Sequence, residues 1–191
     1  MRAGKTPAVL FVCETTPLAK TDNVYISALC DMFFHRLFQG AGGTFVSAKR
    51  EFIPVSSKSN IAIPDTVKKI ERAKKLFFPA EIMVFYVVVC FDADSIGKAE
   101  RQANEEIIHW CEAQGYIPLV FSKNVEQVLD VPHEEASKKE RAGIFAKSNK
   151  KYLKEAPYVQ AMSHPLSETL SGYHRSNFML VLQSVLNDFS K

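Results

Sequence analysis

The sequence predicts an α/β fold in which a Rossmann-like, parallel sheet of about four strands is flanked by helices. Two segments, 8–13 and 82–91, are runs of apolar, β-forming residues without polar alternation, which is typical of strands buried on both faces. Segments with apolar residues at helical spacing lie between them and after them. Strand and helix therefore alternate along the chain, an order that indicates βαβ units and a parallel sheet.

The first half of the chain supplies the first strand, Ala8–Cys13, and a helix that begins at Asp22. Apolar residues recur along one face of this helix, and a run of glycines ends it, as glycines at the C-terminus of a helix commonly do. Two segments follow that are weak candidates for a strand or a loop, Thr44–Ala48 and Glu51–Val55. An amphipathic helix with a lysine-rich outer face is then expected over residues 65–77.

The second half contains the clearest element of the chain, the apolar strand Ile82–Phe91. A helix over residues 98–114 and a further buried strand, Ile117–Phe121, continue the alternation. After this strand the sequence becomes charged and helical. We therefore expect an α/β core over residues 1–132 and a helical C-terminal extension over residues 133–191 that packs on the core.

The composition excludes several classes of protein. With 191 residues, 47% of them hydrophobic, and a net charge of +3, the chain can form one compact domain and is not a histone-like binder. Its four cysteines are widely spaced without a CxxC pair, which excludes a zinc ribbon or a dithiol redox motif. No dinucleotide or P-loop motif is present. The apolar runs are too short for a signal-peptide core or for the ~20 residues of a membrane span, so we expect a cytoplasmic protein without membrane contact.

Acidic residues follow the predicted strands at the points where ligands bind in open parallel sheets, outside the carboxyl ends of the strands. Glu14 follows the first strand, and Asp92 and Asp94 follow the central one, where both carboxylates can point into one crevice. Clustered carboxylates repel one another unless a cation neutralises them, and Mg²⁺ prefers such oxygen ligands. Glu126, shortly after the next strand, could complete a two-metal arrangement.

An apolar strand ending in Glu, a helix carrying a Tyr, and a second apolar strand ending in Asp-x-Asp occur in this order in VLFVCE (9–14), TDNVYISAL (21–29) and VVVCFDADS (87–95). This order resembles the Toprim domain, the Mg²⁺-binding fold of topoisomerases, bacterial primases, overcoming-lysogenization-defect (OLD) nucleases and small RNA-maturing nucleases. Within that group the chain looks most like the short RloB-like branch. Ser122, Asn124 and Glu126 partly match a third stretch of that branch.

The resemblance implies a Mg²⁺-dependent nuclease, with Mn²⁺ as a substitute, that acts on DNA or RNA. It implies that Glu14 acts in general acid/base work or as a metal ligand and that Asp92 and Asp94 hold the metal. Glu126 would be a further ligand. Metal ligation and an activated water suit phosphodiester cleavage, since charge at the transferring phosphate must be neutralised.

The lysine-rich segment AKSNKKYLKEAPY (146–158) resembles the basic helical tail of the same branch. Lys151 and Lys154 are therefore candidate catalytic residues that would stabilise charge on the phosphate as mobile cations. By analogy with the family, the implied partners are nucleic acid and a partner ATPase or another defence protein, with a role in defence against phage. A long amphipathic helical pattern runs from Pro165 to Lys191, and it also suits a homodimer.

Three other functions are compatible with these residues. A glycosyltransferase uses Asp-x-Asp to hold a metal and a nucleotide-sugar diphosphate, and an aspartyl-nucleophile phosphatase is phosphorylated on the first Asp of the motif. Glu14 discriminates, because it matters only to the Toprim interpretation. The third alternative is a non-catalytic Toprim module that binds nucleic acid or a partner, since Thr15 stands where the family usually has Gly.

Overall fold

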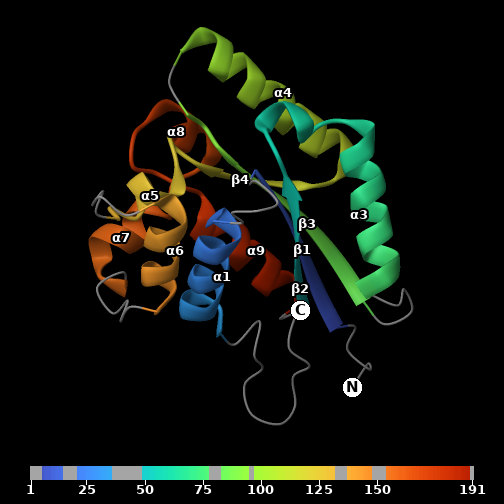
Figure 1. Cartoon of the computed structure of the whole chain (residues 1–191), viewed down its shortest axis with the longest axis horizontal. Helices are drawn as coiled ribbons and strands as arrows, with labels where there is room; N and C mark the ends of the chain where they lie inside the picture. The colour runs from blue at the N-terminus through green and yellow to red at the C-terminus, as the bar shows by residue number, and fades with distance from the viewer. Residues whose placement is uncertain are drawn as a thin grey trace.

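The computed structural model describes residues 6–14, 21–35, 49–77, 83–94, 97–131, 137–147 and 154–189. The described strands form one parallel sheet with helices on both faces (Figure 1). In the order β2-β1-β3-β4, the strands are β2 (Lys49–Val55), β1 (Thr6–Glu14), β3 (Met83–Asp92) and β4 (Ile117–Phe121). All three strand pairs are parallel, so the predicted fold class is confirmed.

The described helices link and cover these strands. After β1 comes α1 (Thr21–Phe33), and between β2 and β3 lie the 3₁₀ helix η1 (Lys58–Asn60) and α3 (Pro64–Phe77). The connection from β3 to β4 is α4 (Lys98–Gln114). Five helices described after β4 complete the chain: α5 (Val125–Val128), α6 (Lys138–Lys147), α7 (Ala156–Ala161), α8 (Leu166–Ser171) and α9 (Phe178–Phe189).

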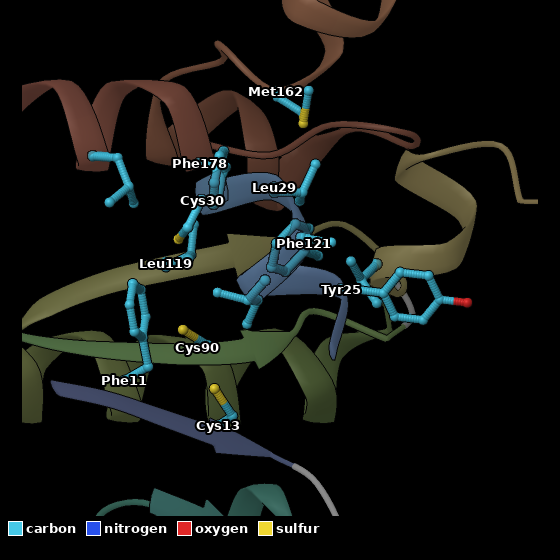
Figure 2. Close-up of a cluster of buried hydrophobic side chains, with 14 of the residues drawn as sticks. Phe11, Cys13, Tyr25, Leu29, Cys30, Cys90, Leu119, Phe121, Met162 and Phe178 are labelled. Carbon is cyan, nitrogen blue, oxygen red and sulfur yellow. The ribbon is translucent and has the colours of Figure 1, made fainter. Parts of the chain in front are cut away.

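Alternate residues of the central strands face two separate hydrophobic cores, which is why these strands lack polar alternation. In β1, Phe11 and Cys13 point toward the core shared with α1 and α9, and Leu10 and Val12 point toward the core shared with α3 and α4. Figure 2 shows the first core, with side chains from both central strands and β4 lying beneath α1 and the C-terminal helices. The sheet is therefore covered on both faces.

The strand order places a topological switch point between β1 and β3. From β1 the chain crosses to β2 on one side, whereas β4 lies on the other side of β3. Cys13 pairs with Cys90, so the two strands end at nearly the same level, with Glu14 and Asp92 as their last residues. In open parallel sheets this is the position of the ligand crevice.

The structure confirms some of the predicted helices and strands and differs from others. Glu51–Val55 is confirmed as part of β2, whereas Thr44–Ala48 lies outside the described residues. The helical pattern from Pro165 onward is not continuous: α8 ends before Gly172, which is extended, and α9 begins at Phe178. Within the described residues, no helix is long and apolar enough to cross a membrane.

The segment that separates α8 from α9 pairs with the outer edge of β4. Ser176 forms a bridge with Phe121, and its hydroxyl donates to the carbonyl of Val120 at 2.7 Å. The Asn177 side chain accepts a hydrogen bond from Val120 N–H (2.8 Å) and donates one to Pro118 O (2.9 Å). These bonds satisfy polar groups of β4, and this requirement overrides the helical pattern of the sequence.

Candidate active site at the carboxyl ends of the strands

Glu14 is held at the end of β1 by the first turn of η1. It has the same strand parity as Leu10 and Val12, so it lies on the side of the sheet that α3 and α4 cover. The backbone N–H of Lys58 donates to Glu14 Oε1 at 3.0 Å. The other oxygen, Oε2, is buried and accepts no hydrogen bond from the described residues. Burial raises the pKa of this carboxyl, and the nearby Lys58 only partly offsets the effect.

Asp94 is brought toward Glu14 by a turn that follows β3. Ala93 N–H still donates to Phe121 O of β4 at 2.8 Å, and Asn104 of α4 donates to Ala93 O at 3.2 Å. Asp94 then takes a left-handed conformation, with φ of 55°. Its exposed carboxylate forms an ion pair with the ammonium group of Lys58, so one lysine contacts both acids.

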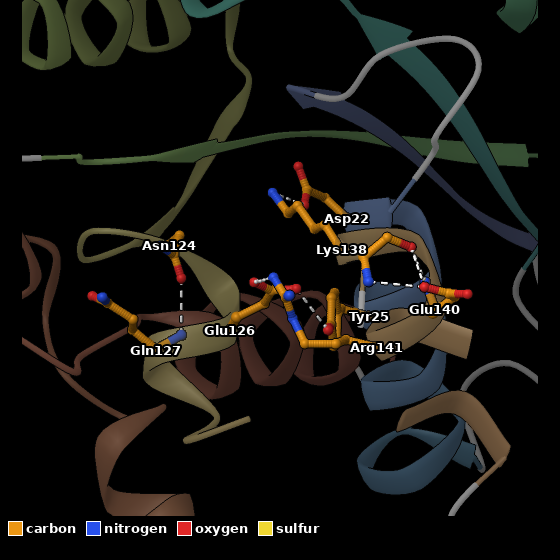
Figure 3. Close-up of polar contacts among 9 residues, drawn as sticks. Asp22, Tyr25, Asn124, Glu126, Gln127, Lys138, Glu140 and Arg141 are labelled. Atoms are coloured by element: carbon orange, nitrogen blue, oxygen red, sulfur yellow. Dashed lines mark hydrogen bonds and ion pairs between the residues drawn. The ribbon is translucent and has the colours of Figure 1, made fainter. Parts of the chain in front are cut away.

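Asp92 has different neighbours. It shares strand parity with Cys90, so its side chain lies on the face of the sheet that α1 covers. Burial is the main cause that raises its pKa well above the usual value, and the charge of Asp22 on α1 raises it further. Lys138 of α6 counters this repulsion, with its Nζ 3.4 Å from Asp22 Oδ1 (Figure 3).

The two aspartates of the Asp-x-Asp motif are therefore partnered separately. Lys58 pairs with Asp94, and Lys138 lies among Asp22 and Asp92. Burial alone would lower the pKa of Lys138, but the charges of Asp22 and Asp92 outweigh it and raise that pKa. Each lysine thus supplies a positive charge to one pair of acids at the switch point.

Glu126 lies beside this cluster, on α5. Asn124 caps α5 by accepting a hydrogen bond from Gln127 N–H at 2.9 Å, and this places Glu126 in the first turn, buried. Its Oε1 accepts from the Tyr25 hydroxyl at 3.0 Å, and its Oε2 accepts from Arg141 Nη2 at 2.9 Å (Figure 3). Burial and the adjacent Glu126 charge raise the pKa of Tyr25, which stays protonated and donates. As a metal ligand, the role predicted for it, Glu126 would have to share or exchange one of these partners.

Helix α6 contributes one cation to the acids at the switch point and another to Glu126. Lys138 and Arg141 are three residues apart and so project from the same face of α6. Figure 3 shows Lys138 directed at Asp22 and Arg141 directed at Glu126. Both side chains therefore extend from α6 toward acids of the site.

The two lysines predicted to be catalytic are not part of this arrangement as described. Lys154 is exposed just before α7 and forms no ion pair with a carboxylate of the described residues. Lys151 lies outside the described residues. Their catalytic role stays a prediction.

Three residues that sequence reasoning did not select do lie in the site: Asp22, Lys58 and Lys138. Asp22 had a signal, since it opens the helix that follows the first strand and belongs to the stretch TDNVYISAL. Lys58 lies three residues after the end of β2, but the sequence marked β2 only as a weak candidate. Lys138 had no such signal in the sequence, because its position depends on how α6 packs against α1.

The chemistry of the site suits a hard cation, but a metal centre is not preassembled. Four carboxylates, Glu14, Asp22, Asp92 and Asp94, repel one another here, and Glu14 Oε2 is a buried acceptor in need of a partner. Among the described residues, however, no group of three or more Asp, Glu, His or Cys is arranged to hold a metal ion. A cation that bound Glu14 would therefore draw other ligands to it by rearrangement of the lysine pairs.

The candidate site thus consists of four carboxylates and two lysines at the switch point, with the Glu126–Arg141–Tyr25 cluster beside it. Glu14 and Asp92 end the two central strands, Asp94 follows the second of these strands, and Asp22 lies in the first turn of α1. The two lysines come from η1, after β2, and from the start of α6. No protein-family model, no curated protein and no solved structure matches this chain.

Proposed function

We propose that the protein is a divalent-cation-dependent enzyme that cleaves phosphodiester bonds of nucleic acid. The observation that carries the proposal is the buried Oε2 of Glu14 at the β1/β3 switch point, which has no hydrogen-bond partner among the described residues and lies beside two further acids, Asp92 and Asp94. A buried carboxylate oxygen without a donor is costly, and a cation or a donating water relieves that cost. Carboxylates at this edge of a parallel sheet also suit a Mg²⁺-bound phosphate.

The residues of the site can take separate roles in phosphodiester cleavage. Burial raises the pKa of Glu14, and its Oε2 accepts no hydrogen bond from the described residues, so this carboxylate can accept a proton from an attacking water. Asp92 and Asp94 would hold Mg²⁺, which supplies positive charge at the phosphate and lowers the pKa of bound water. Lys58, whose side chain is only 13% exposed, can contact a phosphate oxygen as Asp94 turns to the metal.

A second function is favoured by the ion pairs themselves. Lys58 neutralises Asp94 and Lys138 neutralises Asp22, so part of the site is balanced without any metal. A domain of this kind could bind nucleic acid or a partner without turnover. The two functions differ in whether metal-dependent cleavage occurs.

The test is cleavage of plasmid DNA and of total tRNA by the full chain with Mg²⁺ or Mn²⁺. We expect Glu14→Gln and the double variant Asp92→Asn/Asp94→Asn to lose at least 100-fold in rate, as removal of a group that stabilises the transition state commonly does. Glu105→Gln, an exposed acid on α4, is the matched control and should cut as the wild type does. Cleavage that survives in Glu14→Gln contradicts the proposal, and nucleic-acid binding without cleavage by the wild type favours the binding module.

A further inference from the structure

The outer face of α3 carries a row of positive charge. Lys68, Arg72 and Lys75, called here the basic stripe, follow one another at i, i+4 and i+7, so they share one side of the helix. All three residues are exposed. The opposite side of α3 is buried against the sheet through Ile70 and Ala73. The stripe therefore points directly away from the protein.

The acidic residues of α3 do little to cancel this charge. Glu71 lies beside the stripe, three residues after Lys68 and four before Lys75, but its carboxylate is paired with Lys74 at 2.8 Å. Asp65 lies 3.6 Å from Lys68, with both side chains more than 70% exposed, so the pair is weak. Within the described part of the chain, Arg72 and Lys75 form no ion pair with a carboxylate. Lys69 adds a further exposed cation on the flank of the stripe.

The stripe is joined to the candidate active site by a short connection. Lys58, which contacts Glu14 and Asp94, lies in η1, and α3 begins at Pro64 soon after it. Thr66, in the first turn of α3, donates to Asn60 O at 2.6 Å and fixes the two segments together. The N-terminal end of α3 is thus at the site, and the helix runs from there along the flank of the sheet (Figure 1).

We propose that the basic stripe of α3 binds the phosphate backbone of the nucleic acid whose phosphodiester bonds the switch-point acids cleave. This inference rests on the proposed function and specifies the surface to which the nucleic-acid substrate binds. The stripe spans about 10 Å along the helix axis at 1.5 Å per residue, which is the length of about three nucleotides of one strand. Phosphates bound there continue toward Lys58, whose ammonium group would meet the phosphate at the site.

The charge pattern favours nucleic acid over an acidic membrane surface. A helix that lies on a membrane inserts an apolar face below its basic residues. In α3 that face is occupied, since Ile70 and Ala73 are buried against the sheet. The exposed side of α3 is mostly charged, and among its described residues Leu76 is the large apolar side chain that is exposed. One apolar side chain is too little to anchor a helix in a membrane, whereas a row of cations suits the phosphate backbone of nucleic acid.

The test is binding of short fluorescein-labelled DNA duplex, single-stranded DNA and RNA by fluorescence anisotropy, with EDTA present so that no cleavage occurs. We expect Lys68→Glu/Arg72→Glu to bind at least tenfold more weakly than the wild type. Its plot of log affinity against log salt should be shallower by about 1.8 for the DNA duplex and by about 1.4 for single strands, because each lost phosphate contact removes about 0.9 or about 0.7. Lys49→Glu/Arg101→Glu, which makes the same change of charge at two exposed positions off the stripe, should bind as the wild type does apart from the change in net charge.

Thermal unfolding of each variant controls for folding, and Lys68→Gln/Arg72→Gln replaces the charge reversal if that variant is unstable. Equal losses in the stripe and control variants overturn the inference, as does a wild type that binds no nucleic acid. Stripe-dependent binding to phosphatidylserine vesicles without binding to nucleic acid also overturns it. If the wild type cleaves nucleic acid while the stripe variant binds normally, the inference fails and the proposed function stands. Stripe-dependent binding without metal-dependent cleavage supports the inference and rejects the proposed catalysis.

Discussion

At the level of single residues, the carboxyls of Glu14, Asp22 and Asp92 lie in surroundings that disfavour their charged form. Burial is the largest cause of the raised pKa in each. An acid whose pKa is higher in the folded chain than in the unfolded chain binds more protons when folded. Stability therefore falls as pH rises from the unfolded pKa to the folded one, and the loss is complete above the folded pKa. The ionised form of each of these acids therefore lowers the stability of the fold, as groups at functional sites often do.

Removal of one of these charges should stabilise the fold. We expect Asp92→Asn to have a higher free energy of unfolding than the wild type at pH 8, where the Asp92 carboxylate is most costly. The difference should shrink toward pH 4, since the wild-type carboxyl is protonated in the folded chain at low pH. Urea unfolding at both pH values measures it, with the exposed Glu105→Gln as the control. A less stable Asp92→Asn at pH 8 would mean that attraction to Lys138 outweighs burial.

Sequence reasoning located the acidic residues of the site better than its lysines. Glu14 and Asp92 end strands whose apolar runs are visible in the sequence, so their shared edge follows from the fold class. Lys58 and Lys138 contact the acids across long sequence separations that no local pattern marks. The pairing of Asp94 with Lys58 depends on a left-handed backbone turn, and a motif of two aspartates does not reveal that turn.

At the level of elements, the end of α4 depends on backbone conformation rather than on side-chain packing. Gly115 closes this helix with φ of 67°, and its N–H donates to Glu112 O at 3.1 Å. A Cβ at this position would meet no atom within 4 Å, so only the left-handed conformation penalises a substitution.

Two glycine-to-alanine changes should therefore have opposite effects. Gly115→Ala should lower the free energy of unfolding by about 1 kcal/mol, because alanine is strained at positive φ. Gly143→Ala, inside α6 with no atom near the added Cβ, should raise it by about 0.5–1 kcal/mol, because alanine favours helix. Urea denaturation of both variants gives the comparison, and equal effects of the same sign would contradict this explanation.

The C-terminal helices show why helical periodicity alone misplaces element boundaries. The apolar spacing of the last 27 or so residues suits one long helix, but Ser176 and Asn177 leave it to bond with β4. An open strand edge needs partners for its N–H and C=O groups, and this tertiary requirement is not encoded in local spacing. The fold class was predictable because burial on both faces leaves a strong local signal.

At the level of the whole molecule, the C-terminal extension is part of the same structure as the sheet. Phe178, Leu182 and Val185 of α9 are fully buried in the core that also contains Phe11. Asn177, just before α9, forms hydrogen bonds to β4 through both the oxygen and the nitrogen of its side-chain amide. The extension therefore supports β4, the strand that precedes Glu126 and α5.

The bonds of Asn177 should contribute strongly to global stability. Asn177→Ala should lower the free energy of unfolding by about 2–3 kcal/mol, because Val120 N–H is left buried without an acceptor. Asn187→Ala, an exposed asparagine on the same helix, is the matched control and should change stability by about 0.5 kcal/mol or less. Chemical denaturation measures both, and a cost for Asn177→Ala no larger than that of the control would show that water replaces the lost bonds.

The most direct test of the central claim is Mn²⁺ binding by the full chain, followed by the loss of the free Mn²⁺ signal in electron paramagnetic resonance. If the acids at the β1/β3 switch point hold a divalent cation, the wild type binds Mn²⁺, binding strengthens as pH rises because ligands must lose protons, and Glu14→Gln loses most of the affinity. Glu105→Gln, away from the switch point, should bind as the wild type does. Absence of Mn²⁺ binding by the wild type, or equal binding by Glu14→Gln, would contradict the claim.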